Sequence, residues 1–403
     1  MTSEQQNPLA VDKISSLILR FSVPSIIAML VSAVYNIADQ LFIGNAVGTL
    51  GNAATNIAFP LAMMCTGLGL LFGIGGAASF NLHMGAGKKE KAPYFVGNAI
   101  TMLLTVGILL FAITELFLNP LLVGFGSPAD VLPLARQYVR VTAIGFPFLI
   151  LTIGSGHLIR ADGSPKMAMF VNISGAVINI VLDIVFVSQF HMGVAGVAYA
   201  TVIAQAISAV LCMWRLMRMT DIFDFRPKYL KMKKQYSMEI IRLGLPSGIT
   251  QAIFSMAMVI VQSLTNSFGE MVIAANVIIM RVDGFAMMPN FSFGTAMTTY
   301  AGQNVGARRM DRVEQGAKQG TLIAVGTSTT ITLLIVIFGH HLMGIFTNTT
   351  ELVTLSANMM KILAVGYIAM AITQSLSGVM RGAGDTMTPM WISMVVTVVI
   401  RVP

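Results

Sequence analysis

The sequence predicts an all-α integral membrane protein made of two pseudo-symmetric six-helix bundles, the second truncated at its C-terminus. Hydrophobic residues make up 55% of the 403 residues and charged residues only 10%, with a mean hydropathy of +0.78. A soluble domain of this composition would have no water-facing exterior left. In addition, long apolar runs fill most of the chain, and motifs of its first half recur in its second half about 221 residues later.

The repeat is visible in short motifs that place a proline or a glycine turn at matching positions. The pairs are 21–25 with 243–247, Gly85-Ala86 with Gly306-Ala307 ahead of basic residues, and 158–163 with 379–384. A duplicated set of membrane helices places a cavity between two bundles, and rocking one bundle against the other gives alternating access. The repeat therefore predicts a transporter.

Eleven apolar runs are long enough to cross a bilayer, which takes about 20 helical residues. They lie near 17–40, 52–80, 94–118, 137–158, 166–190, 193–217, 241–266, 271–302, 315–340, 355–379 and 387–403. By the repeat, Pro403 matches Leu182, in the middle of the fifth run. The second half then lacks a counterpart for residues 183–220, so we expect a truncated twelve-span protein.

Three domains follow from these runs. We expect an N-terminal six-span bundle at 1–217, a cytoplasmic linker at 218–240 and an incomplete C-terminal bundle at 241–403, which holds spans seven to eleven. The linker is rich in lysine and arginine, and we expect it to be a solvated surface strap rather than a partner-binding element.

The lysines and arginines predict the orientation in the membrane. The net charge of +8 comes from basic residues between the apolar runs, so we interpret it as a topology signal and expect no nucleic-acid partner. Basic residues lie at 13–20, 88–91, 160–166, 218–240 and 308–318, whereas loops 41–51, 189–193 and 341–354 have none. The positive-inside rule places the N-terminus and the linker in the cytoplasm. Residues 1–16 lack a cleavable signal pattern, so span one is expected to be an uncleaved anchor of a multi-pass cell-membrane protein.

Two carboxylates inside the predicted spans are the first site candidates, because ionisable groups in hydrocarbon are costly and mark functional positions. Counted from Arg20 and Lys166, Asp39 and Asp183 both lie roughly 26–28 Å from the cytoplasmic boundary at the helical rise per residue. Desolvation disfavours the charged form of a buried carboxylate, so these acids are suited to couple transport to protons. The alternative is that each merely ends its span at the membrane surface.

Polar neighbours surround both acids in the sequence. Tyr35 and Asn36 share a helix face with Asp39. Asn172 and Asn179 form one polar stripe with Asp183 on an otherwise apolar helix. We assign all six residues to an ion- or proton-coupling site.

The second half offers a candidate substrate cavity. Arg281 and Asp283 in span eight match Pro60 and Ala62 in span two, so this charged pair exists in one half only. Arg281 and Asp283 do not share a helix face, so we expect each of them to contact its own partner or water. The pair is expected to have either a structural role or a substrate role. Further candidates on spans seven and eight are Gln262, Met256, Met280 and Met287. Methionine suits a surface that must accept many shapes, although most of the methionines are expected to be packing residues.

Turns on the cytoplasmic side are expected to be structural. Arg160 with Asp162, and Arg381 with Asp385, would each fix the corresponding turn. Pro24 and Pro246 lie inside spans one and seven, where the missing amide donor kinks a helix.

Several classes of function are excluded. Gly87-Lys88 lacks the earlier glycine of a phosphate loop, so nucleotide hydrolysis is not expected. His157 and His191 are isolated, and Cys65 and Cys212 lie inside apolar runs, so we expect no metal site, no disulfide framework and no cofactor. An intramembrane enzyme would need a catalytic constellation, and a receptor would need a large soluble sensor region. Neither appears in the sequence. The energy source is then expected to be an ion gradient, or there is none.

Taken together, the motifs resemble the multidrug and toxic compound extrusion (MATE) family, in its DinF/MepA-like branch. The residues that carry the resemblance are Pro24, the two Gly-Ala-basic turns, Gln-Asn-Val-Gly-Ala-Arg at 303–308 and Arg-Gly-Ala-Gly-Asp-Thr at 381–386. The resemblance covers essentially the whole chain. It implies a twelve-helix antiporter that exports hydrophobic organic cations in exchange for protons or sodium ions.

By position, the resemblance assigns Asp39, Asp183 and Asn179 to the N-bundle ion site of that branch. Span ten has no acid and span seven offers only Gln251 and Gln262, unlike the NorM-like branch, whose coupling acids lie on those spans. We therefore expect a monomeric exporter of amphipathic cations, coupled to protons or sodium ions, whose partners are these small molecules and the lipid bilayer. The alternative, a lipid-linked saccharide flippase, would need a basic cavity, for which only Arg281 and Arg401 are available.

Overall fold

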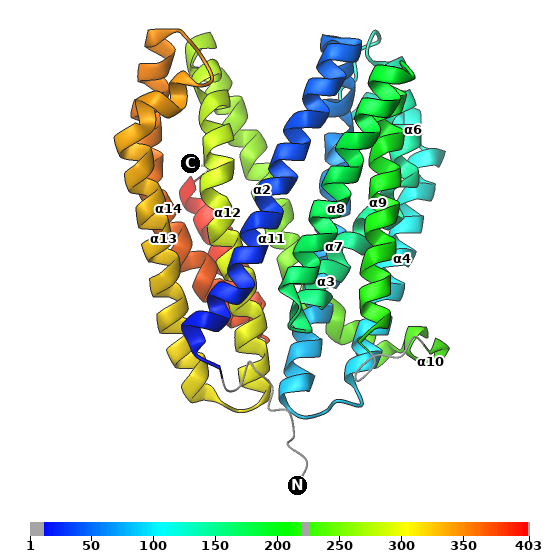
Figure 1. The fold of residues 1–403 in the computed structure, drawn as a ribbon, viewed down its shortest axis with the longest axis vertical. Coiled ribbons are helices and arrows are strands. Elements are labelled where there is room, and N and C mark those ends of the chain that lie inside the picture. The colour runs from blue at the N-terminus through cyan, green and yellow to red at the C-terminus, as the bar shows by residue number, and fades with distance from the viewer. Residues whose placement is uncertain (1–11, 220–225, 402–403) are drawn as a thin grey trace. The chain divides into compact units, whose positions relative to one another are not determined.

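The computed structural model describes residues 12–219 and 226–401, and within these ranges every regular element is a helix. Figure 1 shows the helices in chain order. They are α2 (Ile14–Val47), α3 (Thr49–Gly85), α4 (Ala92–Leu116), α5 (Leu118–Gly124), α6 (Leu132–Ile144), α7 (Phe146–Ala161), α8 (Pro165–Asp183), the π-helix η1 (Ile184–Gln189), α9 (Gly193–Met217), α10 (Pro227–Leu230), α11 (Lys234–Asn266), α12 (Glu270–Gly306), α13 (Met310–Gly344), α14 (Thr350–Gly382), α15 (Met387–Met394) and the π-helix η2 (Val395–Arg401).

The membrane spans agree with the first ten apolar runs. In the described ranges nine helices are long and apolar enough to cross a membrane, and there are ten if α6 and α7, which meet at a bend of 52°, are counted as one span. Pro147 in the first turn of α7 lacks an amide donor, which explains the break at this point. The eleventh run is seen as the shorter apolar stretch Met387–Val399, and residues 402 and 403 lie outside the described ranges. The all-α membrane fold is confirmed.

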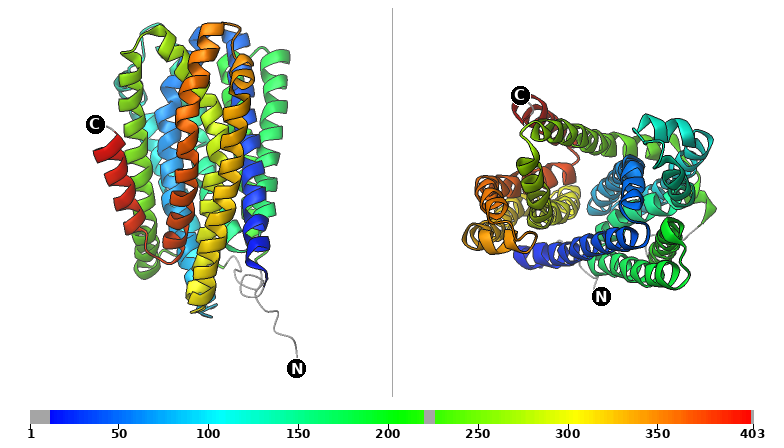
Figure 2. Two further views of the ribbon diagram at one scale, coloured as in Figure 1. Left: turned by 90° about the vertical axis from the view of Figure 1, so that its left-hand side faces the viewer. Right: turned by 90° about the horizontal axis from the view of Figure 1, so that it is seen from above.

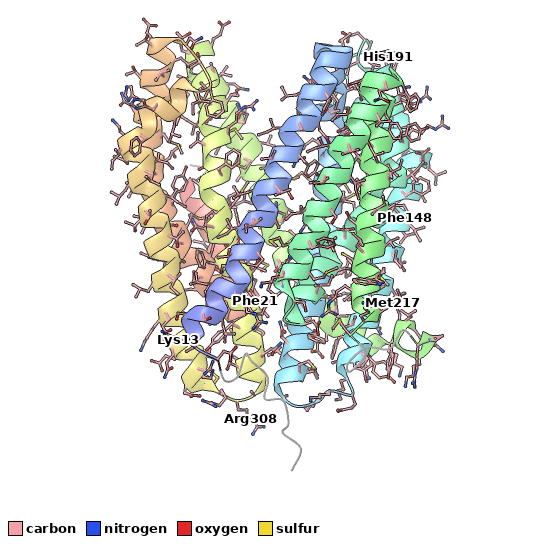
Figure 3. All side chains as sticks on the ribbon, viewed as in Figure 1. Lys13, Phe21, Phe148, His191, Met217 and Arg308 are labelled. Atoms are coloured by element: carbon pink, nitrogen blue, oxygen red, sulfur yellow. The ribbon has the colours of Figure 1, made fainter. Side chains whose placement is uncertain are left out.

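The internal repeat extends to backbone conformation. Three pairs of turn residues with positive φ are separated by the repeat distance of about 221 residues. They are Gly48 (74°) and Gly269 (95°), Gly87 (73°) and Arg308 (57°), and Gly163 (78°) and Gly384 (90°). In the second pair an arginine adopts the left-handed conformation that its counterpart, a glycine, adopts without strain. Figure 3 shows Arg308 in the turn beyond the end of α12.

The chain forms two compact units, each described by itself. Among the described residues, unit 1 contains 12–26, 81–87 and 249–401, and unit 2 contains 27–80, 88–219 and 226–248. The start of α2 and the end of α3 thus belong to unit 1, and the start of α11 to unit 2. The division of the sequence at 1–217, 218–240 and 241–403 stays a prediction.

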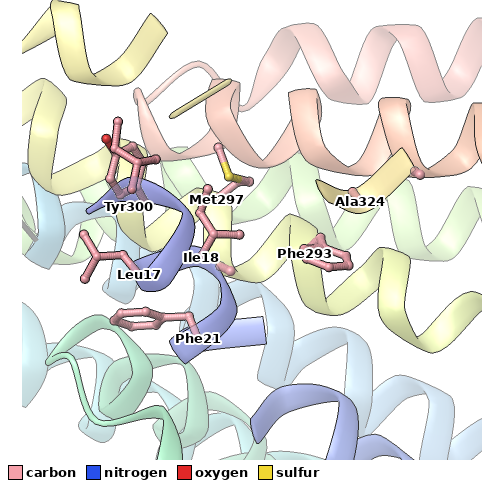
Figure 4. Close-up of a cluster of buried hydrophobic side chains, with 10 residues drawn as sticks. Leu17, Ile18, Phe21, Phe293, Met297, Tyr300 and Ala324 are labelled. Carbon is pink, nitrogen blue, oxygen red and sulfur yellow. The ribbon is translucent and has the colours of Figure 1, made fainter. Parts of the chain in front are cut away.

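In unit 1 the helices α12, α13 and α14 pack against one another, and the views of Figure 2 show them side by side. The start of α2 adds its apolar face to this core. Figure 4 shows Ile18 and Phe21 of α2 beside Phe293, Met297 and Tyr300 of α12. All five side chains are at most 4% exposed.

One pair of repeat-related motifs forms a close helix crossing that needs glycine. In unit 1 a Cβ atom on Gly85 would overlap the carbonyl oxygen of Gln303, and one on Gly306 would overlap that of Leu82. The end of α3 therefore lies directly against the end of α12. The two glycines were predicted to be helix ends, and both helices do end there.

Candidate ion-coupling site

Asp183 lies where its helix changes type. It is the last residue of α8, and the backbone continues as the π-helix η1. Its side chain is 0% exposed, and neither carboxyl oxygen has a hydrogen-bond partner in the described part of the chain. A buried polar group without a partner is costly, and π-turns occur frequently at functional sites. Asp183 is thus a buried, unsatisfied acid at a local irregularity of its span.

Asp39 of α2 lies beside Asp183 in unit 2, close enough for the two carboxyl groups to interact directly. Asp39 is half-buried, and its Oδ1 is also buried without a partner among residues 12–219 and 226–401. Two carboxylates this close cannot both stay ionised in a protein interior at low cost. The pair is therefore suited to hold a proton or a small cation.

Two tyrosines border the acid pair. Tyr35 is half-buried one turn before Asp39, and Tyr138 of α6 is half-buried within electrostatic range of Tyr35, Asp39 and Asp183. Tyr138 is absent from the sequence prediction. A phenol inside an apolar run was a usable signal, but nothing in the sequence placed α6 next to α2 and α8.

The three asparagines near the acids have different surroundings. Asn179 is 3% exposed, its Nδ2 donates to Thr201 Oγ1 of α9 over 3.4 Å, and its Oδ1 is buried without a partner in the described residues. Asn172 is half-buried and Asn36 is exposed, and each donates to the carbonyl oxygen one turn earlier. Only Asn179 therefore leaves a buried oxygen available as a further ligand on the helix that carries Asp183.

The predicted cavity residues of unit 1 belong to separate polar groups. Half-buried Asp283 accepts a hydrogen bond from the hydroxyl of Tyr367, whereas Arg281 is exposed and forms no ion pair with any described residue. Gln262 donates to Asn266 Oδ1 over 2.8 Å. Of these residues, Asp283 of α12 thus has a partner on another span, Tyr367 of α14.

The three predicted methionines have different surroundings in unit 1. Met256 and Met280 are exposed, whereas Met287 packs against the buried core of α12, α13 and α14. A cavity-lining role for them stays a prediction.

The acids of the two turns that Arg160 with Asp162, and Arg381 with Asp385, were expected to fix have other partners. Asp162 forms an ion pair with Arg215 of α9 rather than with Arg160, and Arg215 also donates to Ser164 over 2.7 Å. In the second turn Asp385 accepts the backbone N–H of Thr388 over 3.0 Å instead of pairing with an arginine. Sequence proximity suggested the pairs, but the partner of Asp162 comes from a different helix.

The fold defines a multi-pass membrane protein with a duplicated helix set, and one of its units contains the neighbouring acids Asp39 and Asp183. The sequence profile of the MatE family matches residues 24–185 and matches again at 246–403. The chain belongs to the MatE family, and the resemblance found in its motifs is confirmed. The two matches also reproduce the internal repeat.

Curated relatives and a solved structure agree with this assignment. The chain is 26% identical over 390 residues to the "Probable multidrug resistance protein YoeA" of Bacillus subtilis, covering 95% of this chain and 84% of the relative. It is 23% identical over 368 residues to the "Multidrug export protein MepA" of Staphylococcus aureus, covering 91% and 81%. A transporter described as the outward-facing conformation of a multidrug resistance MATE family transporter has the same fold, with a TM-score of 0.92 at 23% identity, over 100% of this chain and 90% of the other.

Proposed function

We propose that this chain is a secondary active multidrug efflux antiporter, which exports amphipathic organic cations in exchange for protons or sodium ions. The single observation that carries the coupling proposal is the pair of acids in unit 2, in which Asp183 is buried and Asp39 half-buried, and in which Asp39 Oδ1 and both carboxyl oxygens of Asp183 lack hydrogen-bond partners among the described residues. Membership of the MatE family and the names of the relatives support the export of drugs.

Competition at the acid pair would couple the two fluxes. A proton or sodium ion bound between Asp39 and Asp183 cancels negative charge and weakens the attraction for an organic cation. Release of that ion restores the attraction. Thermodynamic linkage makes the effect reciprocal, so each cation lowers the affinity for the other by the same factor.

Neighbouring groups suit this role. The free Oδ1 of Asn179 is available as a neutral ligand, and the hydroxyl of Tyr138 lies near both acids. The π-helix after Asp183 supplies a backbone segment that differs from the regular helix before it. We further propose the orientation that the positive-inside rule favours, with the N-terminus and the linker in the cytoplasm.

Uptake of a fluorescent organic cation into everted membrane vesicles tests the proposal. A pH gradient and a sodium gradient are applied separately, which identifies the coupling ion. Asp183→Asn should abolish gradient-driven uptake while the protein remains in the membrane. Asp130→Asn, which removes an exposed acid from a loop of the same unit, is the matched control and should transport normally. Undiminished uptake by Asp183→Asn would refute the coupling role.

A further inference from the structure

The linker between the spans α9 and α11 is held by one buried side chain of α4. Asn98 is 0% exposed, and its Nδ2 donates to the carbonyl oxygens of Tyr229 (3.1 Å) and Lys231 (3.4 Å). Its Oδ1 accepts the backbone N–H of Lys233 (2.9 Å) and the hydroxyl of Ser237 (3.1 Å). Residues 226–234, here called the strap, are mostly exposed, as expected of a surface strap, but several of their backbone groups are bonded to α4. Residues 220–225 of the predicted linker lie outside the described ranges.

Two neighbours of Asn98 strengthen the attachment. Thr101 Oγ1 donates to the carbonyl oxygen of Leu230 over 2.8 Å. A Cβ atom on Gly97 would overlap the carbonyl oxygen of Tyr229, so α4 and α10 are in direct backbone contact. The strap is consequently fixed on unit 2 before any ligand binds.

The strap carries a group of basic side chains. Its four lysines are exposed, and none forms an ion pair with an acid in the described ranges. They are Lys228, Lys231, Lys233 and Lys234. Two of the ammonium groups are held over aromatic rings, with Lys228 Nζ 4.5 Å from the centre of Tyr229 and Lys233 Nζ 4.3 Å from the centre of Tyr94. The tyrosine rings themselves pack at 4.9 Å, so this part of the array is ordered.

One apolar side chain lies among the lysines, and a tryptophan lies near the start of the linker. Met232 lies between two of them and is 51% exposed. Trp214, in the last turns of α9, is 41% exposed with Arg218 stacked over its ring at 4.1 Å. Because the strap joins two membrane spans, it lies at a bilayer surface. Figure 1 shows α10 at the lateral edge of unit 2, beside the start of α4.

We propose that the strap is a binding site for the phosphate headgroups of anionic phospholipids. Four exposed ammonium groups without acid partners, two of them held over tyrosine rings, complement the negative charge of such headgroups. Met232, within the strap, can make the apolar contact with a lipid that free phosphate cannot make. This site is independent of the ion-coupling proposal, because it involves neither acid of the pair.

Tryptophan quenching by brominated lipids tests the proposal on the full chain in nanodiscs. The chain has two tryptophans, so Trp391→Phe leaves Trp214 as the reporter at the end of α9 where the linker begins. Brominated phosphatidylglycerol and brominated phosphatidylcholine are titrated separately. The parent should prefer the anionic lipid, and the triple variant Lys231→Gln, Lys233→Gln, Lys234→Gln should lose that preference, by up to roughly a hundredfold at low salt.

A matched variant separates a specific site from net charge. Lys88→Gln, Lys89→Gln, Lys91→Gln removes three exposed lysines from another loop of the chain and should keep the preference. Should the triple variant fold poorly, the single variants Lys231→Gln and Lys234→Gln should each lose part of it. Three results would each overturn the proposal. The strap variants could keep their full preference for the anionic lipid, the loop variant could lose as much of it as the strap variants, or inorganic phosphate could displace the lipid at constant ionic strength.

Discussion

The hydroxyl of Tyr367 donates a hydrogen bond of 2.8 Å to Oδ1 of Asp283 and so joins α14 to α12 within unit 1. The carbonyl oxygen of Tyr367 accepts Asn290 Nδ2 over 3.1 Å, and Asn290 Oδ1 accepts the hydroxyl of Ser328 over 2.6 Å. A polar network therefore connects three helices of unit 1. Asp283 is its half-buried end.

The first prediction concerns this hydrogen bond. Tyr367→Phe removes the donor, and Asp283→Asn removes the charge of the acceptor. Hydrogen bonds to charged groups contribute about 1.5–3 kcal/mol, so the double variant should be less destabilised than the sum of the single variants by about 1–2 kcal/mol. Denaturant unfolding of the four proteins in detergent measures this coupling. Strictly additive losses would mean that the contact contributes nothing.

The second prediction concerns the crossing of α3 and α12. Gly306→Ala places a methyl group where the carbonyl oxygen of Leu82 already lies, so one helix must move. We expect a loss of about 1–3 kcal/mol, visible as a lower melting temperature. Gly67→Ala on α3 is the control, because no atom lies within 4 Å of a Cβ at that position. Equal melting temperatures for the parent and Gly306→Ala would contradict the close packing.

The third prediction concerns backbone strain at Arg308. The left-handed conformation (φ 57°) costs an L-residue roughly 1–2 kcal/mol, whereas the repeat-related Gly87 has φ 73° at no such cost. Arg308→Gly should therefore stabilise the protein by about 1 kcal/mol. The reciprocal variant Gly87→Arg should destabilise it, although its Cβ would meet open space. Thermal unfolding of both variants checks the opposite signs.

The fourth prediction concerns pH. Burial raises the pKa of Asp162 to about 6 from its ordinary value of 3.8, although Arg215 beside it acts in the opposite direction. The folded state thus binds the proton more tightly, and the stability this provides is present below about pH 4 and lost as the pH rises through 6. Between these values the parent should lose up to about 3 kcal/mol of unfolding free energy relative to Asp162→Asn.

Melting temperatures of the parent and Asp162→Asn, measured from pH 4 to 6, check this difference. Asp385 is the contrasting case, because hydrogen bonds from Thr388 lower its pKa. Asp385→Asn should therefore remove stability that is present above pH 4, the opposite sign. Parallel pH curves for the parent and Asp162→Asn would show that Asp162 titrates normally.

The spans were predictable because hydropathy and length alone determine whether a helix can cross a bilayer. Individual contacts between side chains were harder to predict from the sequence. The partner of Asp162 is Arg215, about 53 residues away in the chain, and local spacing suggested Arg160 instead. Pro147 explains the bend between α6 and α7 from the sequence alone. No feature of the sequence predicts that Tyr138 lies beside two other helices. The depth argument assigned Asp39 and Asp183 to one site, and both do lie together.

The sequence by itself determined that this protein is an all-α membrane protein with an internal repeat, because apolar length, charge bias and recurring turn motifs are properties of the chain. Tertiary structure alone decided which buried atoms lack partners, which helices cross at Gly85 and Gly306, and that Asn98 fixes the strap. These features depend on contacts between segments up to about 220 residues apart. Hydrophobic patterning requires each span to be buried in a bilayer or a bundle, but it does not specify which neighbour covers which face.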